Sequence, residues 1–115
     1  MPLDVSSSVP SDFGSLFNDQ ERTSIVVNNA GLLRGQKFLQ TDPAQIEAMI
    51  KTNVHPYVYM TKYALLHFKA TSKAHNHRNA MLYTSSSAAH ANITFFGVYA
   101  GTKTHNYVFA NLIRN

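Results

Sequence analysis

Residues 79–103 read N-A-M-L-Y-T-S-S-S-A-A-H-A-N-I-T-F-F-G-V-Y-A-G-T-K and pass from an apolar strand through a serine cluster and a loop into a helix. Tyr99 and Lys103 are four residues apart, so both project from one face of that helix. A free phenol titrates near pH ~10, and a cation held close to it favours the phenolate and lowers that pKa. The pair therefore predicts a tyrosine that gives or takes a proton near neutral pH. Ser86 lies thirteen residues before the tyrosine, at the end of the strand, where its hydroxyl could bind the same substrate oxygen.

The tyrosine–lysine pair is a weak signal when it stands alone. Of the six tyrosines, only Tyr99 has a lysine four residues on, and chance produces such a pair fairly often. By itself the pair is more often structural than catalytic, so its interpretation depends on the motifs that accompany it.

Length and composition indicate one small globular domain. The chain has 115 residues, of which 44% are hydrophobic and 14% charged, as in a packed core. The formal net charge of +4 comes without a basic run, so no nucleic-acid partner is indicated. Cysteine is absent, which excludes a disulfide framework and thiolate metal ligands and fits a reducing compartment. The six histidines lack the helical H-x-x-x-H spacing of a zinc site, so no metal is expected.

Helical and strand patterns alternate along the chain. The predicted elements are a helix over 11–21, a buried strand over 24–28, a helix over 43–73, a strand over 80–84, a loop over 85–97 with room for a helical turn, and a helix over 98–114. No apolar run approaches the roughly 20 residues that span a bilayer, and no signal peptide is recognisable. The alternation predicts an α/β fold with parallel strands.

The long central helix has a clear start and an internal break. Asp42 is a good helix cap, and Pro43 suits the first helical position. Pro56 has no amide hydrogen, and its ring crowds the carbonyl of Thr52, so the helix should kink there. Asn53 lies beside this kink, where backbone groups are left without helical partners.

Four sequence features now stand in one order: Val27-Asn28-Asn29-Ala30-Gly31 after a strand, Asn53 in a kinked helix, Ser86 after the next strand, and Tyr99 with Lys103. This order and spacing resemble the short-chain dehydrogenase/reductase superfamily. The N-N-A-G motif and the Y-x-x-x-K pair are signatures of that family, and the resemblance covers essentially the whole chain.

The resemblance implies a doubly wound, Rossmann-type parallel sheet with helices on both faces, and hydride transfer between a nicotinamide cofactor and a carbonyl compound or alcohol. Tyr99 would be the general acid/base, and Lys103 would assist it and hold the nicotinamide ribose. Ser86 would hydrogen-bond the substrate oxygen. Asn53 would maintain the kink that positions a water on a proton relay to Lys103.

The resemblance also implies the cofactor-binding residues. Residues Asn28, Asn29, Ala30 and Gly31 would stabilise the central strand and border the cofactor, together with Tyr99 and Lys103. Asp4 and Val5 match a D-V pair that follows the family's third strand and contacts the adenine. The residues that distinguish NAD from NADP lie near the family's second strand and have no counterpart here.

The chain departs from the family pattern at both ends. None of its five glycines forms the glycine-rich phosphate loop, and the first βαβ unit and the C-terminal part have no counterpart. We therefore expect residues 1–115 to be the central part of one NAD(P)-binding domain, an internal fragment whose strand stub at Leu3–Val5 has no neighbouring strand. The alternative is a truncated, catalytically inactive product that does not bind the cofactor on its own.

Partners and location follow from the resemblance only in outline. A small carbonyl or alcohol substrate is expected, with a faint likeness to the steroid dehydrogenase and 3-ketoacyl-CoA reductase branch. The helices at 43–73 and 98–114 often form a dimer interface in the family, although core burial is their more common use. We expect a cytoplasmic protein, or one at the cytosolic face of the endoplasmic reticulum if a longer chain carries an anchor.

Overall fold

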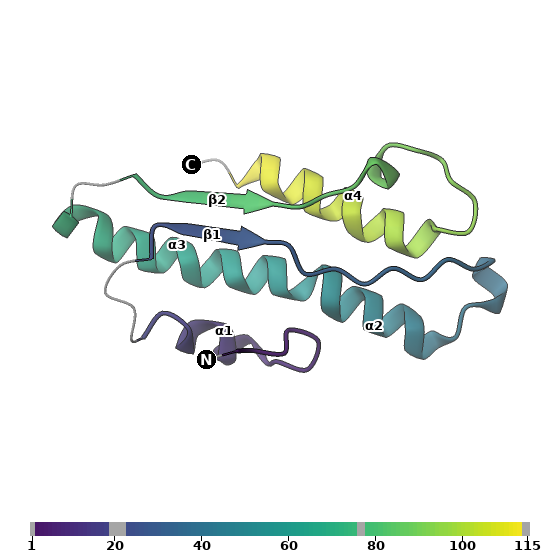
Figure 1. Cartoon of the computed structure of the whole chain (residues 1–115), viewed down its shortest axis with the longest axis horizontal. Helices are drawn as coiled ribbons and strands as arrows, with labels where there is room; N and C mark the ends of the chain where they lie inside the picture. Colours follow the sequence, from purple (N-terminus) through teal and green to yellow (C-terminus); the bar gives the residue numbers. More distant parts are fainter. Residues whose placement is uncertain (1, 19–22, 76–77, 114–115) are drawn as a thin grey trace.

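The computed structural model describes residues 2–18, 23–75 and 78–113 of the chain (Figure 1). Helices and strands follow one another in this order: α1 (Pro10–Ser15), β1 (Ile25–Asn28), the 3₁₀ turn η1 (Phe38–Gln40), α2 (Pro43–Asn53), α3 (His55–His75), β2 (Ala80–Tyr83), the 3₁₀ turn η2 (Ser87–Ala89) and α4 (Gly97–Leu112). Among these residues, no helix has both the length and the apolarity needed to cross a bilayer.

The two strands form a parallel sheet, as the alternating pattern predicts. Ile25 is opposite Ala80 and Asn28 is opposite Tyr83, and α2 and α3 connect the two strands. The amide of Thr84 donates to the carbonyl of Asn28 at 2.9 Å, which continues the pairing just past the end of β2. Both strands therefore end at the same edge of the sheet.

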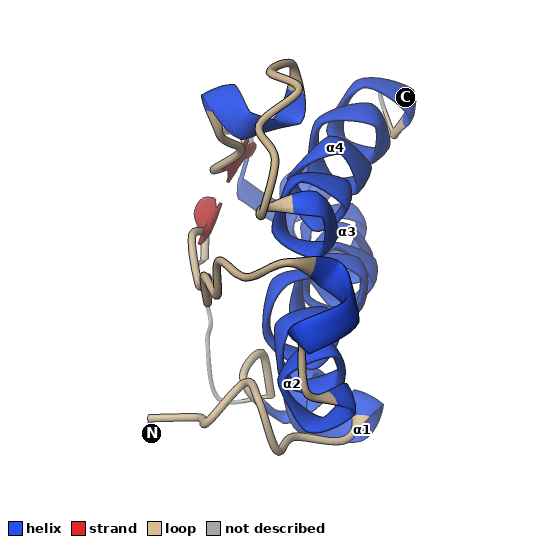
Figure 2. Cartoon of the chain, turned by 90° about the vertical axis from the view of Figure 1, so that its right-hand side faces the viewer, coloured by secondary structure: helices blue, strands red, loops and turns tan. Residues whose placement is uncertain are grey.

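All the longer helices lie on one side of this sheet. Figure 2 shows α2, α3 and α4 together on one side, with the two strands beside them. Parallel crossover connections share one hand, so helices that follow successive strands in one direction cover the same face. The described residues thus supply one of the two helical layers that a doubly wound sheet has.

Burial in β1 follows from this one-sided layer. Val26 is 9% exposed and packs against Ala64 and Phe68 of α3, whereas its neighbour Val27 is 58% exposed. Leu82 of β2 is also exposed, on what we call the open face of the sheet. The prediction of a fully buried strand over 24–28 is wrong, because a strand covered on one side buries only alternate residues.

The long helix is divided where the sequence predicts a break. Asp42 caps α2 through a 2.8 Å hydrogen bond from the amide of Ala44 to Oδ1, and Pro43 occupies the first turn. The helical backbone is interrupted at Val54, and α3 begins one residue later. Asn53 is thus the last residue of α2 and is fully buried.

The N-terminal segment differs from its prediction. The first helix was expected over 11–21, but α1 ends at Ser15 and residues 19–22 lie outside the described residues. It also begins earlier, because the carboxylate of Asp12 accepts from the amide of Val9 at 2.8 Å and so caps the first turn. Leu3–Val5 forms no strand, so the stub expected there is absent.

Matched substitutions in β1 test the one-sided cover. Val26→Thr places a hydroxyl in an apolar cluster and should lower the free energy of unfolding by about 1–3 kcal/mol. Val27→Thr changes an exposed side chain and should alter it by less than about 0.5 kcal/mol. Urea unfolding followed by circular dichroism measures both, and equal losses would contradict the arrangement.

Candidate active site

The ends of the two strands surround a buried lysine. Lys103 is 3% exposed, and its Nζ donates to the carbonyl oxygen of Thr84, immediately after β2, at 3.3 Å. The same carbonyl accepts from the hydroxyl of Tyr57 at 3.1 Å. In open α/β sheets, ligands bind in the crevice at the carboxyl ends of the strands. The ammonium of Lys103 therefore lies where this class of fold places its chemistry.

Two tyrosine rings lie against this ammonium. Nζ of Lys103 is 5.8 Å from the ring centroid of Tyr99 and 5.6 Å from that of Tyr57, within the range of cation–π attraction. Burial lowers the pKa of Lys103 below its ordinary value, because desolvation disfavours the charged amine. Burial, and secondarily the proximity of Tyr99, raises the pKa of Tyr57. The tyrosine–lysine pair predicted from the sequence is thus brought together in space.

The N-N-A-G loop passes directly beside the lysine. A Cβ atom placed on Gly31 would lie 3.3 Å from Nζ of Lys103 and 3.9 Å from Oδ1 of Asn53. A side chain at this position would therefore crowd the ammonium, which would have to shift by a few tenths of an ångström. Asn29 accepts through Oδ1 from the hydroxyl of Thr84 at 2.8 Å, which ties the loop to the end of β2.

Asn53 joins three separate segments through its side-chain amide. Its Oδ1 accepts from the amide of Leu32 at 2.6 Å, and its Nδ2 donates to the carbonyl of Leu32 at 2.9 Å. Nδ2 also donates to Oγ1 of Thr102 at 3.0 Å, in the helix that carries Tyr99 and Lys103. The asparagine therefore fixes the N-N-A-G loop to α4 across the break between α2 and α3.

Two residues of this network were missed in the sequence. Thr102 donates through Oγ1 to the carbonyl of Tyr99 at 2.7 Å, and the fully buried Asn106 donates through Nδ2 to the carbonyl of Asn53 at 2.9 Å. Thr102 lies three residues and Asn106 seven residues after Tyr99, a spacing that puts all three on one face of the helix. A polar residue on the helix face that the sequence pattern predicts to be buried could have indicated both of them.

Ser86 lies at the start of η2, next to α4. Its Oγ accepts from the amide of Ala88 at 3.2 Å, so its hydroxyl hydrogen is left to donate elsewhere. The preceding Ser85 donates to the carbonyl of Lys103 at 2.9 Å, which fastens the serine loop to α4. In the described part of the chain, Ser86 and Tyr99 share no hydrogen bond.

The remaining candidates are Asn28, at the end of β1, and the N-terminal pair Asp4 and Val5. Asn28 is 5% exposed, and its Nδ2 has no hydrogen-bond partner among the described residues. Val5 lines a cavity together with Lys51 and His55, at the junction of α2 and α3. The carboxylate of Asp4 accepts from both the amide and the hydroxyl of Ser6, which lowers its pKa. No cluster of three metal-ligating side chains occurs within residues 2–18, 23–75 and 78–113.

The chain belongs to the short-chain dehydrogenase family, whose model matches residues 7–115. No curated protein sequence shows significant similarity to it. Among solved structures it is similar to serine dehydrogenase from Escherichia coli, with 26% identity, a TM-score of 0.81 and coverage of 96% of this chain and 50% of that one.

Two further structures are similar over the same region. An NADH-dependent reductase A1-R′ complexed with NAD has 26% identity and a TM-score of 0.80, with coverage of 96% of this chain and 48% of that one. ElxO with NADP bound has 25% identity and a TM-score of 0.77, with coverage of 94% and 42%. The chain thus spans 42% to 50% of the length of these three structures.

The lowered pKa of Lys103 predicts a pH dependence of stability. The amine of the unfolded chain has the ordinary pKa of 10.5, and the folded chain releases the same proton at a lower pH. Just below pH 10.5 the unfolded chain therefore binds more protons than the folded chain, so the free energy of unfolding should rise with pH there. Lys103→Met removes this contribution, so the wild type should gain stability relative to it as pH increases. Lys62→Met, at an exposed position, should keep the wild-type slope. Parallel curves for the wild type and Lys103→Met in urea unfolding would contradict the shift.

Proposed function

We propose that this chain carries the catalytic residues of an NAD(P)-dependent oxidoreductase that interconverts a carbonyl compound and an alcohol. The observation that supports this most is the buried ammonium of Lys103 against the ring of Tyr99, at the carboxyl ends of two parallel strands. The family match and the nicotinamide dinucleotides in the similar structures agree with it.

Tyr99 is the proton donor and acceptor in this proposal. Negative charge develops on the substrate oxygen during reduction, and the phenol supplies a proton as it develops. The ammonium of Lys103 stabilises the phenolate that remains. The hydroxyl of Ser86, whose oxygen already accepts from Ala88, donates a second hydrogen bond to the same substrate oxygen.

Asn53 acts by position in the same proposal. Its side-chain amide is hydrogen-bonded to Leu32 and Thr102, whereas its backbone carbonyl bonds elsewhere. That carbonyl accepts from Asn106 and has a second lone pair, so it can also hold a water on a path to Lys103.

The residues at this edge fit the nicotinamide end of the cofactor. The ammonium of Lys103 has three donors, of which one bonds Thr84 in the described part of the chain, and Gly31 leaves space beside it. When bound, the dinucleotide supplies or accepts the hydride.

Residues 1–115 offer fewer contacts for the adenosine end of the cofactor. No glycine-rich turn is present in the sequence to cradle a pyrophosphate, and Asp4, expected at the adenine, is engaged with Ser6. Residues 1–115 by themselves are therefore not expected to bind the cofactor tightly; this is the second candidate, in which the catalytic residues are present but the isolated chain does not turn over.

Thermal unfolding distinguishes the two candidates. A ligand that binds only the folded state raises the melting temperature. Because tight cofactor binding is not expected, the isolated 115-residue chain should show no increase in melting temperature with added NADPH or NADH. A cooperative transition that moves upward with cofactor concentration would overturn this expectation and favour the autonomous enzyme.

The central role of Tyr99 is tested in whichever form of the protein shows turnover. Tyr99→Phe removes only the hydroxyl and should lower kcat by about 10²–10⁴-fold, without a change in the circular dichroism spectrum. Tyr107→Phe, on the same helix but 46% exposed, is the matched control and should keep activity. Near wild-type kcat in Tyr99→Phe would refute the assignment.

A further inference from the structure

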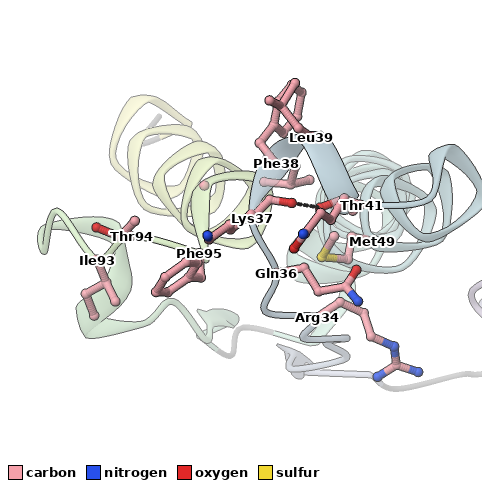
Figure 3. A pocket seen from close by; sticks show the side chains of 13 residues that line it. Arg34, Gln36, Lys37, Phe38, Leu39, Thr41, Met49, Ile93, Thr94 and Phe95 are labelled. Carbon is pink, nitrogen blue, oxygen red and sulfur yellow. Dashed lines mark hydrogen bonds between the residues drawn. The ribbon is translucent and has the colours of Figure 1, made fainter.

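A cavity opens between the loop that follows the N-N-A-G motif and the loop that precedes Tyr99 (Figure 3). It has a volume of about 480 Å³, within the range of small-molecule sites. Gly97 and Val98 form part of its lining, and Tyr99 is the next residue of the chain. The cavity therefore lies at the N-terminal end of α4, the helix that carries the proposed proton donor.

The two loops are fastened to each other. The amide of Gln36 donates to the carbonyl of Phe95 at 2.9 Å. Phe95 has a φ of 80°, a conformation that costs energy for any residue with a side chain and persists where neighbours hold it. Gly35 is packed so closely on Phe96 that a Cβ atom there would lie 2.6 Å from the ring. The cavity is thus formed by the chain before any ligand enters.

The walls are largely apolar. Met49, Ile93, Phe95 and Val98 line the cavity together with Phe38. Phe38 is 69% exposed and Phe95 is 48% exposed, so both retain apolar surface that a ligand would cover. Burial of such surface is favourable by roughly 25 cal/mol per Å². The shape and lining fit a ligand with an extended apolar part.

The charges in the lining are all positive. Arg34 and Lys37 contribute to the lining, and no aspartate or glutamate does. Arg34 donates to the carbonyl of Leu33 at 3.0 Å and points away from the cavity, whereas the amine of Lys37 is directed toward Phe95 (Figure 3). In the described part of the chain, the one ion pair joins Lys51 to Glu47, so Lys37 has no carboxylate partner there.

We propose that this cavity binds an apolar carboxylic acid, with its hydrocarbon part against Phe38, Ile93 and Phe95 and its carboxylate paired with Lys37. A single ammonium balances a singly charged carboxylate, whereas a phosphate dianion would need further donors. Resting on the proposed function, this makes the substrate an apolar oxo- or hydroxy-acid, whose reacting carbon extends toward Tyr99.

Ligand binding by the 115-residue chain tests the proposal directly. Decanoate and 1-decanol share a hydrocarbon chain and differ in charge, and the shifts of the Phe95 and Val98 amides in ¹⁵N-resolved NMR spectra report each titration. Decanoate should bind more tightly. Lys37→Gln should weaken decanoate about two- to fivefold, since Lys37 is exposed, and should leave decanol unchanged.

Two control variants complete the experiment. Lys37→Arg keeps the charge and should keep decanoate affinity, and Lys62→Gln removes an exposed cation of α3 outside the cavity and should have no effect. Equal binding of decanol and decanoate, or an unchanged decanoate affinity in Lys37→Gln, would overturn the proposal. The titration needs neither cofactor nor turnover, so its failure leaves the test of Tyr99 standing.

Discussion

The side-chain amide of Asn53 is the interaction on which the arrangement of this edge depends. A fully buried amide must satisfy its donors and its acceptor, and each group left without a partner costs about 1–3 kcal/mol. Here one partner, Leu32, lies in the loop after β1 and the other, Thr102, lies in α4. The requirement for hydrogen bonds therefore positions two segments that are far apart in the sequence.

The rest of the edge follows from this connection. With α4 fixed against the loop, Gly31 and the carbonyl of Thr84 meet the ammonium of Lys103 from two sides. Because the ammonium is buried there, it lies against the ring of Tyr99 rather than in solvent. The break in the central helix at Val54 gives the amide of Asn53 access to both segments.

Local rules of sequence were sufficient for much of this fold. Aspartate followed by proline favours a helix start, as at Asp42 and Pro43, and the division of the long helix near Pro56 follows from a missing amide hydrogen. The family motifs named Gly31, Tyr99 and Lys103, which lie near one another, but also Asp4, which is engaged with Ser6 instead. The exposure of Val27 needed three-dimensional information. No helix of the described residues covers that face of the sheet, and a β-branched run does not reveal this.

Contacts between distant segments were beyond sequence reasoning in the same way. Asn106 looks like an ordinary polar helix residue until its partner, the carbonyl of Asn53, is seen. Phe95, which has a positive φ, accepts a hydrogen bond from the amide of Gln36, and neither residue suggests a turn by itself. A cavity made by two loops, including its charge, becomes visible only when both loops are placed.

Hydrogen exchange at the amide of Leu32 tests the role of Asn53 most directly. The 2.6 Å bond to Oδ1 predicts that this loop amide exchanges about tenfold or more slowly than the amide of the exposed neighbour Leu33, and that Asn53→Ala removes the difference. Exchange of Leu32 as fast as that of Leu33 in the wild type would contradict the account.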